Sequence, residues 1–498
     1  MSYLTIPGVI IYSDPEEVAG MGTDPGSVYP NTFFLPPSGI QRGSVFLGDG
    51  DPLSPTWTSV DGAYRLNIND TELPKIPCQP IGYGDAERLL SVMGGEEVPV
   101  EWRGGVEGLT YRLGPGFDQA HTGWRVRLVV NNYIRDSKSE NVIGLIRGSQ
   151  EPDRAVIFGN HRDAWGYGAV DPSSGTAIMM EVARVLGQKV RAGWRPRRSI
   201  VLGSWAAEEA GIMGSAEMVH DKLHQLMNRA VGLVNIDAPL DGNILVPSAS
   251  PSLKAVFVNA MKDVRSANDP SKTLFEFLTE YHRDEESSAG KEVDVEILGS
   301  GTDHASFAYY AGVPAVYHNF IIDRKKYPTS GAYPTYHTGY ETFYLVDKIL
   351  DPGFAISKSS AQLNLHIILQ LSETPLLPYK PADILSPLEA ALQGEQFETL
   401  KLIGLGESLE VMVESLTHFK SVVETWTREL EDMQEAGELE DKLRLRMKND
   451  QMMMLERVFI LPEGLPGRKN YRHALFSPSK FNSYGGSKQN KKNFLMKY

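Results

Sequence analysis

The sequence predicts an α/β protein built on a mixed, mostly parallel sheet covered by helices. Between residues 136 and 374, short apolar runs alternate with amphipathic helical stretches, a pattern typical of strands buried on both faces. The chain has 498 residues, of which 41% are hydrophobic and 22% are charged. Such a length and composition indicate an ordinary globular protein that divides into several domains.

Residues 1–135 are predicted to form a small β-rich domain. They are rich in Gly, Pro and Asp, and turn signals separate β-prone runs at 8–13, 64–68 and 125–134.

The central domain is predicted over residues 136–374. The amphipathic stretches at 173–190 and 251–264 are expected to be helices that cover the sheet. Its strands are expected at 141–146, 155–160, 199–205, 231–237 and 314–319.

Residues 375–498 are predicted to form a helical domain. Long helical periods run from about 385 to 460, and the methionine-rich run at 451–459 is expected to be packed in a core. The end of the chain, from about residue 486, is basic and lacks an apolar period, so it is expected to be disordered.

Charge and cysteine content exclude several classes of protein. A net charge of -14 without clustered Lys or Arg argues against a nucleic-acid partner. A single cysteine, Cys78, excludes an intrachain disulfide framework. No apolar stretch approaches the roughly 18 to 20 residues that span a bilayer, so the chain as written is expected to be soluble and to lack a membrane anchor.

The segment GNHRDAWGYGAVDPSSG, residues 159–175, follows an apolar strand and precedes a helix. It places His161, Asp163 and Asp171 at the carboxyl end of that strand, where α/β proteins build their sites. The alternative is a plain turn in which Asp171 begins the next helix.

Two further strands favour the site. Glu208 and Glu209 follow the strand at 199–205, and Asp237 ends the strand at 231–237. Because parallel strands deliver their carboxyl ends to one edge, these acids are expected to meet His161 there.

A second histidine, His337, completes a set suited to two metals. Catalytic zinc commonly takes three protein ligands, so five residues with one shared carboxylate can serve a metal pair. Glu208 would face the attacking water as general base, while Asp163 would hold the His161 ring in its ligating tautomer. The predicted ligands of two Zn²⁺ are His161, Asp171, Glu209, Asp237 and His337.

These residues resemble the glutamate carboxypeptidase II or NAALADase-like group of dizinc peptidases, which is related to the transferrin receptors. The motifs WAAEEAGIMGS, VNIDA, LGSGTDHASF and YPTYHTGYETF occur in the order of that family, and the similarity covers about residues 6–486. The resemblance implies that Asp171 bridges the metals, that His161 and Asp237 complete one site, and that Glu209 and His337 complete the other. Glu208 matches the general base, and Tyr336 matches a tyrosine that donates a hydrogen bond to the tetrahedral intermediate.

The same resemblance implies an architecture and partners. It assigns a protease-associated apical domain, incomplete at its N-terminus, to 1–135, a zinc aminopeptidase-like peptidase domain to 136–374 and a dimerisation domain to 375–498. The protein is therefore expected to be a homodimer through its C-terminal helices. Family members are type II membrane proteins with extracellular catalytic domains, whereas this chain as written is expected to lack such an anchor.

The substrate pocket departs from the family pattern. The positions that bind substrate carboxylates through arginine, asparagine and lysine in glutamate-specific members carry other residues here, so an aminopeptidase or broad exopeptidase is expected. The implied pocket residues are Thr302, Tyr317, Asn319 and Tyr484. A calcium site of the family is also altered. Its positions carry Ser54, Trp57, Glu217 and His220 here, and among these only Glu217 is a strong oxygen ligand for Ca²⁺.

The predicted function is hydrolysis of short peptides by a dizinc metallopeptidase of carboxypeptidase, dipeptidase or aminopeptidase type. The alternative is a shortened, catalytically impaired isoform that only binds partners or dimerises, because family members extend beyond both ends of this chain.

Overall fold

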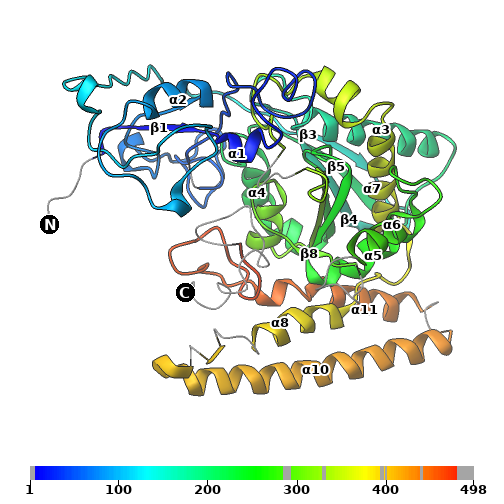
Figure 1. Cartoon of the computed structure of the whole chain (residues 1–498). Coiled ribbons are helices and arrows are strands. Elements are labelled where there is room, and N and C mark those ends of the chain that lie inside the picture. Colours follow the sequence, from blue (N-terminus) through cyan, green and yellow to red (C-terminus); the bar gives the residue numbers. More distant parts are fainter. Residues whose placement is uncertain are drawn as a thin grey trace.

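The computed structural model of the protein describes residues 6–46, 48–283, 293–327, 333–392, 397–398, 401–437 and 441–478. An N-terminal region, a central sheet with its helices, and a C-terminal group of helices follow one another along the chain (Figure 1). Among the described residues, no helix combines the length and the apolar character needed to cross a bilayer.

The central sheet has seven strands in the order β3-β5-β4-β6-β9-β7-β8. β4 is parallel to β5 and β6, β6 is parallel to β9, and β3 and β7 run antiparallel to β5 and β9. The predicted mixed, mostly parallel sheet is therefore confirmed, with β7 and β8 as additions that the sequence analysis did not expect. The strands are β3 (Val142–Ile146), β4 (Glu151–His161), β5 (Arg198–Trp205), β6 (Ala230–Asn235), β7 (Ile244–Ala249), β8 (Glu296–Ile297) and β9 (Ala315–Ile321).

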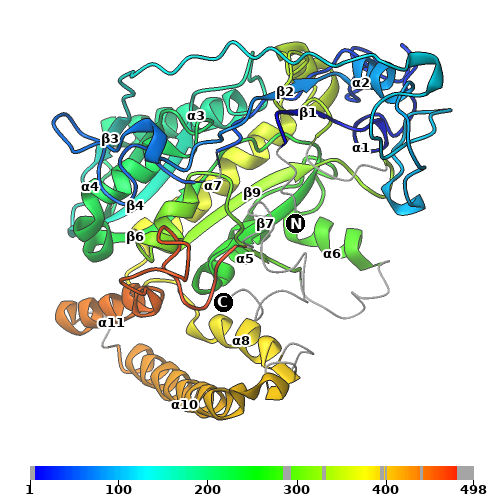
Figure 2. The same cartoon turned by 90° about the vertical axis from the view of Figure 1, so that its left-hand side faces the viewer.

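Helices cover both faces of this sheet. Helices α3, α5, α6 and α7 lie on one side and α4 on the other (Figures 1 and 2). Strand β4 shows the two-sided burial, since Val156 and Phe158 join one apolar cluster and Ile157 joins the other, as alternating side chains require. The helices are α3 (Ser173–Arg191), α4 (Met213–Arg229), α5 (Lys254–Asp263), α6 (Leu274–Arg283) and α7 (Ala355–Glu373).

The N-terminal region contains less β structure than the sequence predicts. Its described elements are β1 (Val9–Tyr12), α1 (Pro15–Val18), β2 (Cys78–Ile81) and α2 (Tyr83–Leu90), with β1 parallel to β2. The expected strands at 64–68 and 125–134 are wrong, because neither pairs with another strand in the described chain. Val126 and Tyr133 are 54% and 82% exposed, so the β-prone side chains lack the neighbours that stabilise a strand.

The C-terminal helices form a separate layer beside the sheet domain (Figure 1). They are α8 (Leu385–Ala391), α10 (Gly406–Glu435) and α11 (Lys442–Met454), as the helical periods predict. Met452 and Met453 are buried in the larger apolar cluster, which confirms core packing for these two residues of the methionine run. The expected disordered tail lies outside the described residues.

Candidate metal centre

Three adjacent parallel strands bring the predicted residues to one edge of the sheet. His161 is the last residue of β4, Glu208 and Glu209 follow β5, and Asp237 follows β6. Asp171 enters from the segment before α3, whose first turn approaches the Asp237 loop closely. A Cβ on Gly175 would lie 2.1 Å from the Asp237 carbonyl oxygen, so only glycine allows this approach.

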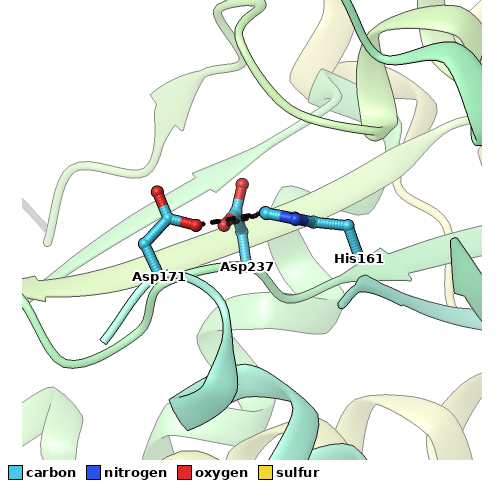
Figure 3. Close-up of side chains that lie close together, drawn as sticks. All are labelled: His161, Asp171 and Asp237. Carbon is cyan, nitrogen blue, oxygen red and sulfur yellow. Dashed lines mark hydrogen bonds and ion pairs between the residues drawn. The ribbon is translucent and has the colours of Figure 1, made fainter. Parts of the chain in front are cut away.

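The first group joins His161, Asp171 and Asp237. His161 Nε2 lies 2.8 Å from Asp237 Oδ1 and 3.3 Å from Asp171 Oδ1. Figure 3 shows the three side chains pointing at one another from different segments. All three are buried, and their ligand atoms lie within 4.8 Å of one another, which suits a single metal ion.

The second group joins Asp171, Glu209 and His337. His337 Nε2 lies 3.1 Å from Asp171 Oδ2 and 3.2 Å from Glu209 Oε2. This group also has its ligand atoms within 4.8 Å of one another. Asp171 therefore turns one oxygen to each group, and its buried Oδ1 has no hydrogen-bond partner among the described residues.

The orientation of both rings fits a cation. His161 Nδ1 lies 3.1 Å from the carbonyl oxygen of Asp163, and His337 Nδ1 lies 3.1 Å from that of Arg42. A carbonyl oxygen only accepts, so each Nδ1 must donate and each neutral ring presents an unprotonated Nε2. In this neutral form each Nε2 lone pair faces a carboxylate oxygen, and a metal ion between the two atoms would remove their repulsion.

Asp163 contacts both His161 and the two glutamates that follow β5. Its backbone carbonyl orients the His161 ring, while its Oδ1 lies 3.7 Å from His161 Nδ1. Its carboxylate instead accepts the amides of Glu208 and Glu209, at 3.0 and 3.1 Å. The contacts to His161 Nδ1 fit the expected role of Asp163, and that role stays a prediction. Asp163 thus couples the two glutamates to the end of β4.

The two adjacent glutamates diverge, as expected. Glu209 approaches His337, whereas Glu208 Oε2 lies 4.0 Å from His161 Nε2. Burial raises the pKa of the Glu208 carboxyl well above its ordinary value, and burial together with Asp171 raises that of Glu209 to about 9. This cluster of acids therefore favours bound cations or protons.

Glu341 supports both groups and was missed by the sequence analysis. Its Oε1 accepts the amides of Val170 and Asp171, at 3.1 and 2.6 Å, and its Oε2 accepts the amide of His337 at 3.2 Å. His337 has φ of 57°, a left-handed conformation that costs roughly 1–3 kcal/mol. The Glu341 contacts hold it in place. A signal was available, since Glu341 follows His337 by four residues.

The other implied site residues lie around this edge. Tyr336 stacks on the His337 ring with centroids 3.6 Å apart. Thr302 is buried and accepts from Asn235 Nδ2 at 3.2 Å. Tyr317 and Asn319 lie two residues apart on β9 and therefore on the same face of the strand. The Tyr317 ring meets His304, and Asn319 donates to Asp241. The predicted pocket residue Tyr484 lies outside the described residues.

The altered calcium position is closed by protein contacts. Glu217 accepts the amide of Asp51 at 2.8 Å and that of Ser59 at 2.6 Å, one on each oxygen. Burial lowers the pKa of the nearby His220 imidazole to about 4. The remaining expected positions, Ser54 and Trp57, form turns of the loop that Glu217 holds.

A separate cavity of about 1090 Å³ lies between α3 and α7. Its lining is mostly apolar and includes Tyr167, Ile178, Phe343 and Leu365, but none of the five predicted metal ligands. The cavity is therefore separate from the predicted metal ligands at the sheet edge.

Comparison with known proteins identifies the domain that carries the centre. Residues 141–350 match peptidase family M28. These residues form a family M28 peptidase domain. A second match covers residues 402–488 and is the transferrin receptor-like dimerisation domain. The resemblance drawn from the motifs is confirmed.

Curated relatives match nearly the whole chain. Aminopeptidase NAALADL1 of Mus musculus is 37% identical over 95% of this chain and 64% of its own length. Probable glutamate carboxypeptidase LAMP1 of Arabidopsis thaliana is 35% identical over 96% of this chain and 64% of its length. The chain thus spans 64% of the length of these relatives.

A solved zinc aminopeptidase from Bacillus subtilis aligns with 47% of this chain and 50% of its own, at 17% identity and a TM-score of 0.34. The family assignment above rests on the sequence matches alone.

Proposed function

We propose that this M28 domain is a dizinc exopeptidase that hydrolyses short peptides. The observation that carries the proposal is the shared carboxylate: Asp171 turns Oδ1 toward His161 and Oδ2 toward His337. Each group of three ligand atoms matches the number of protein ligands that catalytic zinc commonly takes. When bound, such a metal pair supplies Lewis-acid activation of water and of the peptide carbonyl.

The roles of the protein's own residues follow from their positions. His161 and Asp237 would hold one ion, Glu209 and His337 the other, with Asp171 between them. Glu208 lies beside the first group without being part of either, which leaves its carboxylate free to take a proton from the attacking water. It would then return that proton to the leaving amine.

Tyr336 is proposed to act on the carbonyl oxygen. Its ring stacks on His337 and meets Tyr333 edge-on, with centroids 5.6 Å apart. These two contacts restrict the side chain, so the phenol can donate a hydrogen bond to the tetrahedral intermediate without first being ordered. Asp163 and Glu341 would keep the ligand segments in register.

The first experiment separates metal binding from catalysis. The purified protein is expected to hold close to two zinc ions per chain and to release the amino-terminal or carboxy-terminal residue from short peptides. Glu208→Gln should retain zinc while turnover falls by about 10²-fold to 10⁴-fold. The control is Glu181→Gln, an exposed carboxylate of α3 paired with Arg184. A Glu208→Gln variant with wild-type turnover would exclude Glu208 as the general base.

A second proposal is that the protein acts as a homodimer. It is supported by the match at 402–488 and by exposed apolar side chains on α10. Val411 and Val422 are 62% and 48% exposed and lie eleven residues apart, which places them on one face of the helix. Apolar side chains that stay exposed on one face of a helix are typical of a helix that packs against a partner.

A further inference from the structure

Asp241 lies in the loop that follows β6, four residues after Asp237. It is 9% exposed, its Oδ2 accepts Asn319 Nδ2 at 2.8 Å, and its buried Oδ1 has no hydrogen-bond partner among the described residues. A neutral amide on one oxygen leaves most of the charge of a buried carboxylate uncompensated. In its ionised form Asp241 therefore lacks a donor at Oδ1, and a cation there would compensate its charge.

The position of Asp241 is set by the main chain. Phe320 donates its amide to the Pro239 carbonyl, and Asn243 donates its amide to the Ile321 carbonyl, both at 2.9 Å. These bonds fasten both sides of the loop to β9, which also carries Asn319. Because the backbone of the loop is held on both sides of Asp241, we expect its hydrogen-bond partner to be a bound molecule and not another part of the protein.

The surroundings of Asp241 are acidic. Burial first, and then the carboxylates of Asp171, Asp237 and Glu341, raise the pKa of Asp241 well above its ordinary value. None of the ion pairs among the described residues includes Asp241. Asn319 is partly exposed, so the pair lies close to the protein surface. An acidic substrate group would meet repulsion here, whereas an ammonium group would find an acceptor.

We propose that Asp241, positioned by Asn319, binds a primary ammonium group on the amino-terminal residue of the peptide substrate. The ammonium is the free α-amino group or a basic side chain of that residue. This inference rests on the proposed function and adds a direction to it: the peptide enters with its amino end at Asp241, and the bond after its first residue reaches the two metal groups.

The test measures binding in zinc-loaded protein that carries Glu208→Gln, so that turnover does not interfere. Calorimetry compares three peptides: Ala-Ala, N-acetyl-Ala-Ala and N-acetyl-Lys-Ala. Adding Asp241→Asn should weaken binding of Ala-Ala about 10-fold or more, because a hydrogen bond to a charged group is lost. N-acetyl-Ala-Ala should bind equally to both proteins. A loss confined to N-acetyl-Lys-Ala would assign the ammonium to the side chain.

Two variants guard the interpretation. Asn319→Ala removes the contact to Oδ2 and should weaken the same peptide, and Asp263→Asn, an exposed aspartate of α5, should leave all three affinities unchanged. Zinc content and melting temperature verify that each protein is folded and loaded. Equal losses for blocked and free peptides, or no loss at all, would overturn the role of Asp241.

Turnover by the wild-type protein keeps the two proposals apart. If zinc-loaded wild type cleaves no peptide while Ala-Ala binds in an Asp241-dependent way, the proposed function fails and the ammonium site stands. If wild type cleaves Ala-Ala, N-acetyl-Ala-Ala and N-acetyl-Lys-Ala equally well, the function stands and the ammonium site fails.

Discussion

Glu341 offers a sharp test of how the centre is held together. Its carboxylate accepts three backbone amides, from Val170, Asp171 and His337, and it is fully buried. A buried donor left without a partner costs about 1–3 kcal/mol. Glu341→Ala orphans all three amides, so we expect the free energy of unfolding to fall by about 3–5 kcal/mol.

Glu341→Gln separates charge from shape. The glutamine carbonyl can still accept the two amides that now reach Oε1, but its NH₂ group would face the His337 amide. One orphaned donor predicts a loss of about 1–3 kcal/mol. The two retained amides belong to Val170 and Asp171, and the lost one belongs to His337. Because a predicted ligand thus loses its support, we expect zinc affinity to fall about 10-fold to 100-fold.

Urea unfolding of metal-free protein measures the stability, and competition with a chelator measures zinc affinity. Glu280→Gln is the matched control, since Glu280 is an exposed glutamate paired with Lys272 and exposed pairs contribute little. If Glu341→Gln binds zinc as tightly as the wild type, the hydrogen bond from the His337 amide to Glu341 does not position the zinc ligands.

Two further predictions concern stability and association. Burial lowers the pKa of the His318 imidazole to about 3, so the unfolded chain binds a proton at this residue more readily than the folded protein. The contribution of neutral His318 to the free energy of unfolding is therefore complete above the unfolded pKa near 6.5 and is lost as the pH falls toward 3. Between pH 7 and pH 5 this loss is about 2 kcal/mol. Urea unfolding at pH 5 and pH 7 should show that His318→Asn removes this part of the acid sensitivity, and an unchanged pH dependence would contradict it. The double variant Val411→Glu, Val422→Glu should sediment as a monomer where the wild type sediments as a dimer, with its zinc content unchanged. A wild type that sediments as a monomer would refute the dimer.

Much of the central domain could be predicted from the sequence because its signals are local. Apolar runs bounded by turns indicate β4, β5 and β6, and the carboxyl ends of parallel strands meet by the geometry of the sheet itself. His161, Glu208 and Asp237 could therefore be assigned to one edge without coordinates. Their predicted roles as ligands and base stay predictions that the proposed experiments test.

The tertiary structure decided what depends on partners distant in sequence. Residues 125–134 have the composition of a strand, yet they form none, since strand formation requires a neighbour. Asp163 holds the Glu208 segment through backbone amides, and Glu341 joins Asp171 to His337 in the same way. Backbone donors leave no mark on the sequence, which records only side chains. Asp241 shows the same division: its identity is printed in the sequence, but only the fold reveals that one of its oxygens is buried without a partner.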